Sequence, residues 1–463
     1  MTTDIPSADT GDFDLEDRQS LRRVAGLSTE LEDITEVEYR QLRLEKVVLV
    51  GVQLGDLRDA ENSMHELAAL AETAGSEVMD GLLQRRVKPD PATFIGSGKA
   101  KELAAIVAAT GADTVIADSE LAPSQRRALE DTVKVKVIDR TALILDIFAQ
   151  HAKSREGKAQ VELAQLQYLL PRLRGWGESM SRQAGGRVAG GEGIGSRGPG
   201  ETKIELDRRR INSRISKLRR DIATMKTGRD TKRSSRRRSE IPSVVIAGYT
   251  NAGKSTLINR LTGAGVLVEN ALFATLDPTV RRAETADGRP YTISDTVGFV
   301  RSLPHQLVEA FRSTLEEVED ADLVLHVVDG SHPDPEGQIS AVREVFADIG
   351  ATQVPELIVI NKADAAEPDT LERLLRSLPG SVAVSARTGD GISELLAAID
   401  TALPRPAVAI DVVIPFDRGD LVAILHEKAD VESIDYLPEG TAVTGKAYPS
   451  VASLVEPFGR VAP

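Results

Sequence analysis

One segment, SVVIAGYTNAGKST (residues 243–256), constrains the fold of this chain more than any other. Its apolar first half is typical of a buried strand, and the spacing G-x-x-x-x-G-K-S that follows is that of a phosphate-binding loop between a strand and a helix. Glycines let backbone N–H groups surround phosphates, which the N-terminus of the next helix also attracts. We therefore expect a P-loop α/β domain in which Lys254 contacts the β- and γ-phosphates and Ser255 ligates Mg²⁺. The residues assigned to the loop are Gly248, Tyr249, Thr250, Asn251, Ala252, Gly253, Lys254, Ser255 and Thr256.

A D-x-x-G motif follows about 40 residues past this loop, directly after the strand-like PYTIS. It consists of Asp295, Thr296, Val297 and Gly298. The Asp295 carboxylate suits the outer shell of the Mg²⁺ ion. The N–H of Gly298 can reach the γ-phosphate, which would couple this loop to the state of the nucleotide.

The purine base is specified by two later motifs. The apolar run ELIVI leads into NKAD, which is Asn361, Lys362, Ala363 and Asp364, and SVAV leads into SAR, which is Ser385, Ala386 and Arg387. The Asp364 carboxylate can accept from both N–H donors on the edge of guanine, a pair of donors that adenine lacks. Asn361 and the Lys362 stem complete the base pocket, and the SAR loop supplies a backbone N–H to guanine O6. As parts of an ordered series, these motifs predict GTP rather than ATP.

The loop that senses the γ-phosphate is expected between the P-loop helix and D-x-x-G. It is FATLD, or Phe273, Ala274, Thr275, Leu276 and Asp277. We favour Thr275 as the threonine that ligates Mg²⁺, with Thr279 as the alternative. The expected catalytic residues are thus Lys254, Thr275 and Gly298, and the expected metal ligands are Ser255 and Thr275.

Two residues in these motifs bear on mechanism. Phe299 follows D-x-x-G where many GTPases carry a glutamine that orients the attacking water. Because phenylalanine cannot do this, we expect slow intrinsic hydrolysis that something outside the motif completes; the alternative is that Phe299 only packs. Asn251 lies where several GTPases use asparagine to help hold K⁺, so a K⁺ ion is a hypothesis. Equal hydrolysis rates in K⁺ and Na⁺ would remove it.

Alternating strand-like and helix-like segments indicate a multidomain α/β chain. We expect an acidic disordered extension at 1–40, an N-terminal α/β domain at 41–148, and a helical hairpin at 149–226 with a Gly-rich loop at 175–200. A basic linker at 227–240, the Ras-like P-loop domain at 241–403 and a small α+β domain at 404–463 complete the prediction. The hairpin is antiparallel and rests on apolar residues at coiled-coil intervals, such as Ile211, Ile215 and Leu218.

Charge is unevenly distributed along the 463 residues. The net charge is −14, yet residues 203–238 carry a net of +11 and residues 1–40 a net of −7. A localised basic stretch on an acidic protein attracts polyanions directionally. A solvated helix face and linker explain most of these side chains, but the net of +11 still favours a polyanion partner overall. The chain has no cysteine, which excludes disulfides and thiol chemistry. No apolar run is long enough for a membrane span and no secretory signal pattern begins the chain, so a cytoplasmic location is expected.

The Gly-rich loop is the candidate RNA contact. Its candidate RNA-binding residues are Trp176, Arg182, Arg187 and Arg197. Arginines can meet phosphates, and arginine or tryptophan planes can stack on splayed bases. Packing of Trp176 against the base of the hairpin is an equal alternative.

These motifs, together with GWGESMSRQAGGRVAGGEGIGSRGPGETKIELDRRRI (175–211), LFATLDPTVR and DTVGFVRSLPHQLVEAFRSTLEE, closely resemble the HflX family of GTPases. The resemblance covers roughly residues 45–460. It implies binding to the large ribosomal subunit (50S) and 23S rRNA through the hairpin loop, and splitting or rescue of stalled 70S ribosomes under heat or antibiotic stress. The acidic extension and the basic linker lie outside what it explains.

Three functions remain open at this point. The first is a GTPase acting on whole ribosomes, the second a ribosome-assembly GTPase, and the third a nucleotide-gated regulator of a protein partner. The assembly GTPases lack the 175–200 signature. IGSGK (95–99) is short of P-loop spacing, so a structural turn is favoured there over a second nucleotide site. We expect a monomer.

Overall fold

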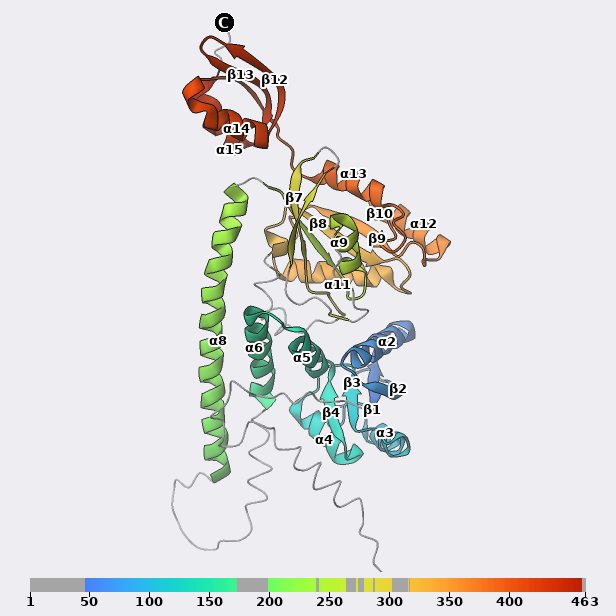
Figure 1. Ribbon diagram of the computed structural model, residues 1–463. Helices are drawn as coiled ribbons and strands as arrows, with labels where there is room; N and C mark the ends of the chain where they lie inside the picture. The colour runs from blue at the N-terminus through green and yellow to red at the C-terminus, as the bar shows by residue number, and fades with distance from the viewer. Residues whose placement is uncertain are drawn as a thin grey trace, which may run out of the picture. The chain divides into compact units, whose positions relative to one another are not determined.

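The computed structural model describes residues 46–172, 199–238, 241–263, 272–273, 279–285, 288–301, 315 and 317–459, with side chains of the long helix described for 205–227. These residues form two compact units. The first holds the described residues up to Met225 together with 272–273 and 297–301, and the second holds the others. The described residues form three sheets, which confirms the predicted multidomain α/β class (Figure 1). Among the described helices, none has the length and apolar character needed to cross a membrane.

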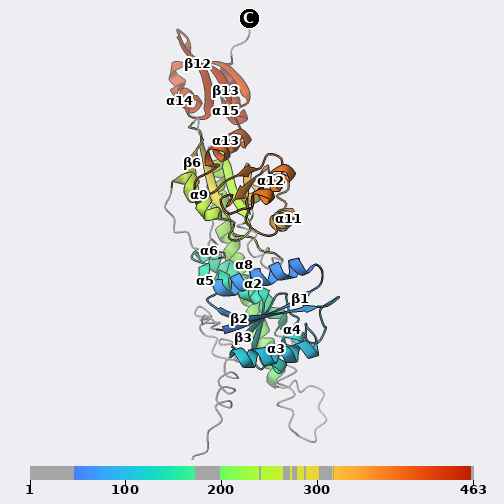
Figure 2. The same cartoon turned by 90° about the vertical axis from the view of Figure 1, so that its right-hand side faces the viewer.

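The N-terminal part is a four-stranded parallel sheet of order β2-β1-β3-β4. Its elements are β1 (Lys46–Gln53), α2 (Leu57–Thr73), β2 (Glu77–Arg85), α3 (Ser97–Thr110), β3 (Thr114–Ala117), α4 (Pro123–Val133) and β4 (Lys136–Asp139). Helix α2 covers one face, and α3 and α4 cover the other (Figure 2). Because both faces are covered, the central strands are buried throughout, as in the run Val47–Val50.

Helix α5 (Arg140–His151) follows β4 directly and was not anticipated as a helix. Asp139 caps it, with its Oδ1 accepting from the Ala142 N–H at 3.0 Å. The same carboxylate accepts from the Tyr168 hydroxyl at 2.8 Å and from Arg172 at 3.2 Å. Asp139 therefore ties the end of the next helix, α6 (Arg155–Arg172), to the parallel sheet.

The hairpin consists of α6 and α8 (Pro199–Arg238), which lie side by side and antiparallel (Figure 1). Leu163 packs against Ile211, Ile215 and Leu218, and Arg214 donates to both Glu162 oxygens at 2.6 and 2.8 Å. This agrees with the predicted apolar intervals. The sequence predicts that the hairpin ends at 226 and that a linker spans 227–240, but α8 continues to Arg238. Lysine and arginine, which dominate this stretch, are good helix formers.

The P-loop part is a six-stranded sheet of order β10-β9-β8-β5-β7-β6, parallel except for β6. Its elements are β5 (Ser243–Gly248), α9 (Lys254–Thr262), β6 (Val280–Glu284), β7 (Pro290–Asp295), β8 (Leu323–Asp329), α11 (Pro335–Asp348), β9 (Glu356–Asn361), α12 (Pro368–Ser377), β10 (Val382–Ala383) and α13 (Ile392–Ala402). The C-terminal ends of the parallel strands β5, β7, β8 and β9 lie at one edge of the sheet. Open α/β sheets bind their ligands at this edge.

The C-terminal part is a three-stranded antiparallel sheet of order β11-β13-β12. It contains β11 (Val408–Ile414), η3 (Phe416–Arg418), α14 (Gly419–Lys428), β12 (Ala429–Leu437), β13 (Gly440–Ala447), α15 (Pro449–Val455) and η4 (Glu456–Phe458). Leu421 and Leu425 of α14 and Val451 and Val455 of α15 pack against this sheet. The predicted small α+β fold is confirmed.

Candidate functional site

The loop between β5 and α9 has a backbone that only glycine permits at two points. Gly248 has φ of 152°, and a Cβ there would lie 2.2 Å from the Val327 carbonyl oxygen. Gly253, at the N-cap of α9, has φ of 87°, and its Cβ would lie 2.2 Å from Asn361 Nδ2. The lack of room for a Cβ at either glycine shows that the backbone of the turn lies close against β8 and β9. The N-terminus of α9 therefore lies at the edge of the sheet.

Lys254 is the first residue of α9 and is only 8% exposed. Its Nζ donates to the carbonyls of Gly248 at 3.0 Å and Tyr249 at 2.8 Å. Burial lowers the pKa of Lys254 to about 8, and the negative charge of Asp295 opposes this shift only in part. The ammonium thus lies inside the loop that the sequence assigns to phosphate.

The D-x-x-G motif lies beside this loop. Asp295 ends β7 and is 3% exposed, and the Ser255 hydroxyl donates to its Oδ2 at 3.2 Å. Thr296 donates through its hydroxyl to the Ile246 carbonyl of β5 at 2.9 Å, which fixes the start of the motif. A hydroxyl and a carboxylate are hard oxygen ligands of the kind that Mg²⁺ prefers, so the two side chains suit the ion that the sequence predicts.

The base motif NKAD is joined to the P-loop and to SAR by one side chain. Asn361, at the end of β9, is 2% exposed. Its Nδ2 donates to the Ala252 carbonyl at 2.7 Å, and its Oδ1 accepts from the Ala386 N–H at 3.0 Å. Lys362 has φ of 59° and its Nζ donates to Asp329 Oδ2 at 2.7 Å, so Asp329 holds the stem predicted to line the base pocket.

Asp364 and the SAR loop face each other. The Asp364 side chain is 14% exposed and forms an ion pair with Arg387. A hydrogen bond from Ser385 and then the Arg387 guanidinium hold the pKa of Asp364 below its usual value. Arg260 of α9 braces the loop from behind, because its guanidinium donates to the carbonyls of Ala386 at 3.3 Å and Arg387 at 2.7 Å.

The P-loop, Asp295, NKAD and SAR therefore meet at the carboxyl edge of one sheet. Sequence reasoning missed two residues that support them. The sequence could have indicated Asp329, since it ends a buried strand as Gly248, Asp295 and Asn361 do. No sequence pattern could have indicated Arg260, because an arginine on a polar helix face is ordinary.

Three family models match the chain: a GTP-binding GTPase N-terminal region at residues 61–149, a GTP-binding GTPase middle region at 151–236, and a 50S ribosome-binding GTPase at 243–362. Among curated proteins, GTPase HflX of Lacrimispora saccharolytica is 42% identical over 90% of this chain and 95% of its own. GTPase HflX of Escherichia coli is 42% identical over 86% of this chain and 92% of its own. A solved structure of a GTP-binding protein from Sulfolobus solfataricus in complex with GDP is 25% identical, with a TM-score of 0.41, over 77% of this chain and 98% of that one.

This chain belongs to the HflX family of GTPases. It therefore binds and hydrolyses GTP, as the four motifs predict.

Several predicted residues of this HflX-family protein lie outside the described residues. Of the γ-phosphate loop only Phe273 is described, so Ala274, Thr275, Leu276 and Asp277 are not placed. The same holds for the four candidate RNA-binding residues of the Gly-rich loop, Trp176, Arg182, Arg187 and Arg197. Their roles remain predictions.

Residues that flank the γ-phosphate motifs belong to the same compact unit as the N-terminal sheet. The Phe273 ring meets the Phe148 ring edge-on, with centroids 4.5 Å apart, and the Leu272 N–H donates to Thr73 Oγ1 at 3.3 Å. The Arg301 N–H donates to Glu66 Oε1 at 3.3 Å. Phe299 lies between Phe273 and Arg301 in the sequence and is 1% exposed. The side chain that replaces the usual glutamine is therefore buried.

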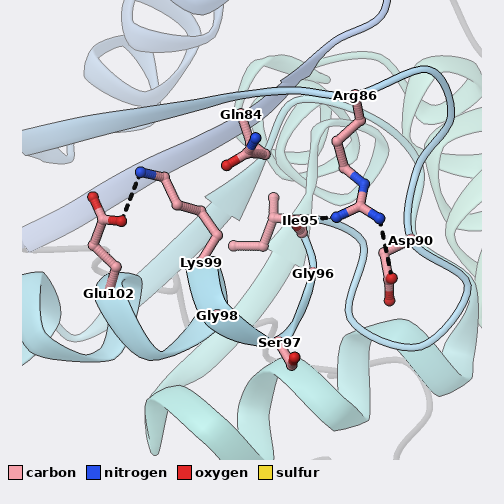
Figure 3. Close-up of a pocket in the computed structure, with 9 residues that line it drawn as sticks. All are labelled: Gln84, Arg86, Asp90, Ile95, Gly96, Ser97, Gly98, Lys99 and Glu102. Carbon is pink, nitrogen blue, oxygen red and sulfur yellow. Dashed lines mark hydrogen bonds and ion pairs between the residues drawn. The ribbon is translucent and has the colours of Figure 1, made fainter.

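The glycine turn at 96–99 borders a pocket of about 460 Å³ (Figure 3). Its lining is Gln84, Arg86, Asp90, Ile95, Gly96, Ser97, Gly98, Lys99 and Glu102. Both cations in it are already paired, Arg86 with Asp90 at 3.4 Å and Lys99 with Glu102 at 2.6 Å. These pairs agree with a structural turn, and a second nucleotide site there stays an untested alternative.

Proposed function

We propose that this HflX-family GTPase binds the large ribosomal subunit in its GTP-bound form and dissociates or rescues stalled 70S ribosomes, in the cytoplasm, under heat or antibiotic stress. The observation that carries this proposal is the convergence of the nucleotide motifs at one sheet edge. The P-loop and the D-x-x-G motif lie in the segment 243–362, which matches the model of a 50S ribosome-binding GTPase. The relatives named GTPase HflX add support, since they match the chain over most of its length.

At the phosphates, Lys254 would neutralise β- and γ-oxygens with an ammonium that the loop already surrounds. Phosphate oxygens would replace the carbonyls of Gly248 and Tyr249 as its partners, while backbone N–H groups and the α9 N-terminus supply the remaining attraction. A bound Mg²⁺ would supply Lewis-acid stabilisation of the developing phosphate charge. Ser255 and Thr275 would ligate the ion, and Asp295 would orient its outer shell.

At the base, Asp364 would accept the two guanine N–H donors, with the Lys362 stem along the ring. The Ala386 N–H, assigned to guanine O6, already donates to Asn361 Oδ1, so this donor would be shared or exchanged when guanine is bound. K⁺ beside Asn251 remains a hypothesis within this proposal.

At the ribosome, the Gly-rich loop would carry Trp176, Arg182, Arg187 and Arg197 to 23S rRNA. Exposed arginines of α8 such as Arg219 and Arg220 add positive charge along the helix that leads from that loop. Because Phe299 offers no group to orient water, the ribosome would complete the hydrolytic arrangement around Gly298 and Thr275.

The test is GTP turnover by the purified protein alone and with 50S, 30S or 70S particles, with light scattering of the 70S sample. Stimulation by 50S or 70S together with falling scatter is expected, and Lys254→Ala should abolish both. Stimulation by precursor particles without a fall in 70S scatter would favour an assembly GTPase. Slow turnover that no particle changes would overturn the ribosomal role and direct the search to a protein partner.

A further inference from the structure

The side chain of Arg387 lies where it interferes with the proposed role of Asp364. The Asp364 carboxylate is 14% exposed, whereas the Arg387 guanidinium that pairs with it is 79% exposed. Oδ2 of this carboxylate accepts from the Arg387 guanidinium, and Ser385 donates a further hydrogen bond to the carboxylate. The carboxylate is thus the less exposed of the two partners, and the arginine approaches it from the solvent side.

A guanidinium is chemically similar to the edge of guanine that an aspartate recognises. Both present N–H donors side by side in one plane, and both match the two oxygens of a carboxylate. Since Arg387 Nη2 already donates to Oδ2, a guanine base that donates to both oxygens would meet the guanidinium at the same edge of the carboxylate. Ion pair and guanine therefore compete for this oxygen.

The SAR backbone does not depend on this ion pair. The Ala386 N–H is held by Asn361 Oδ1, and the carbonyls of Ala386 and Arg387 are held by Arg260. The Gly389 N–H also donates back to the Ser385 carbonyl at 2.8 Å. Breaking the pair would therefore release a side chain without moving the loop.

We propose that the Arg387 side chain competes with the guanine base for the Asp364 carboxylate and so weakens the affinity of the protein for guanine nucleotides. This inference rests on the proposed role of Asp364 in base recognition. The backbone of the SAR loop supports binding while its side chain opposes it. An exposed ion pair contributes little, and its removal corresponds to about a two- to fivefold gain in affinity.

The first experiment is a titration of a fluorescent GDP analogue into the full-length protein and its Arg387→Ala variant at low salt. We expect the variant to bind about two- to fivefold more tightly, with the difference shrinking as salt rises because screening weakens the ion pair. Arg376→Ala is the matched control, because Arg376 is 75% exposed and also pairs with a carboxylate, that of Glu372, in the same part of the chain. Equal or weaker binding by Arg387→Ala would overturn the proposal and indicate that the arginine touches the nucleotide favourably.

A second comparison separates this proposal from the base site itself. Asp364→Asn should shift the preference from guanosine to xanthosine diphosphate, and in that background Arg387→Ala should no longer change affinity for the preferred nucleotide. An unchanged base preference in Asp364→Asn would refute the role of Asp364. A normal shift accompanied by an undiminished gain from Arg387→Ala would overturn only the competition.

Discussion

Lys254 carries its charge in a place that water scarcely reaches, and this makes nucleotide binding sensitive to pH. Its pKa is lowered to about 8 by burial, and phosphate oxygens favour the charged form, so binding raises that pKa and takes up a proton. The affinity for GDP is therefore greatest when the lysine is already charged, below pH 8. It should fall as pH rises above 8, by up to about tenfold per unit.

Titration of GDP between pH 7 and 9 would measure this dependence. Guanosine is the matched control, because it shares the base and its ionisation but has no phosphates. Parallel curves for guanosine and GDP would contradict the assignment of the dependence to Lys254.

Element by element, the sequence predicted those parts whose pattern has one physical meaning. A strand that runs into G-x-x-x-x-G-K-S allows few alternative structures. The same is true of a helix with apolar residues at coiled-coil intervals, such as Ile211, Ile215 and Leu218. Helix α5 escaped prediction because it is buried on several faces, so its pattern lacks a polar side. The end of α8 was misjudged because arginine, lysine and serine are common both in linkers and on exposed helices.

The candidate site shows the same division. Its motif residues were predictable because each is read from a short local pattern. The contacts of Arg260 with SAR and of Arg387 with Asp364 were not, since they join residues whose proximity only the folded sheet creates.

The hairpin offers a prediction at the scale of two helices. Ile215 is 7% exposed and packs against Leu163, so Ile215→Ala leaves a cavity that costs about 2–5 kcal/mol. We expect faster amide hydrogen exchange in 155–172 and 205–227, with GDP affinity unchanged because other elements supply the nucleotide residues. Local exchange is the suitable measurement, since a chain of several domains does not unfold in two states.

Ser216→Ala is the control for that change, because Ser216 adjoins Ile215 on the exposed face of α8. Equal exchange in both variants would show that the apolar contact does not hold the hairpin together.

At the scale of the whole molecule, charge distribution bears on the proposed ribosome binding. The chain has a net charge of −14, so attraction to RNA depends on local basic segments. We expect affinity for 50S particles to fall tenfold or more between 50 and 200 mM salt at constant Mg²⁺. Replacing the exposed Arg219 and Arg220 by glutamine should reduce this salt dependence while leaving GTP turnover of the isolated protein unchanged.

Arg373→Gln with Arg376→Gln is the corresponding control, since it removes two exposed charges from α12. A salt dependence that both pairs of substitutions change equally would point to net charge rather than to α8.

One side chain described above also limits how this site can evolve. Asn361 contacts the P-loop and the SAR loop at once, and its amide leaves no room for a Cβ at Gly253. Residues 253 and 361 therefore form a single mutational unit, in which a change at either position disturbs phosphate and base binding together. Asp364 is not bound in this way, so a lineage or a library selected for a new base can vary position 364 but must keep Asn361.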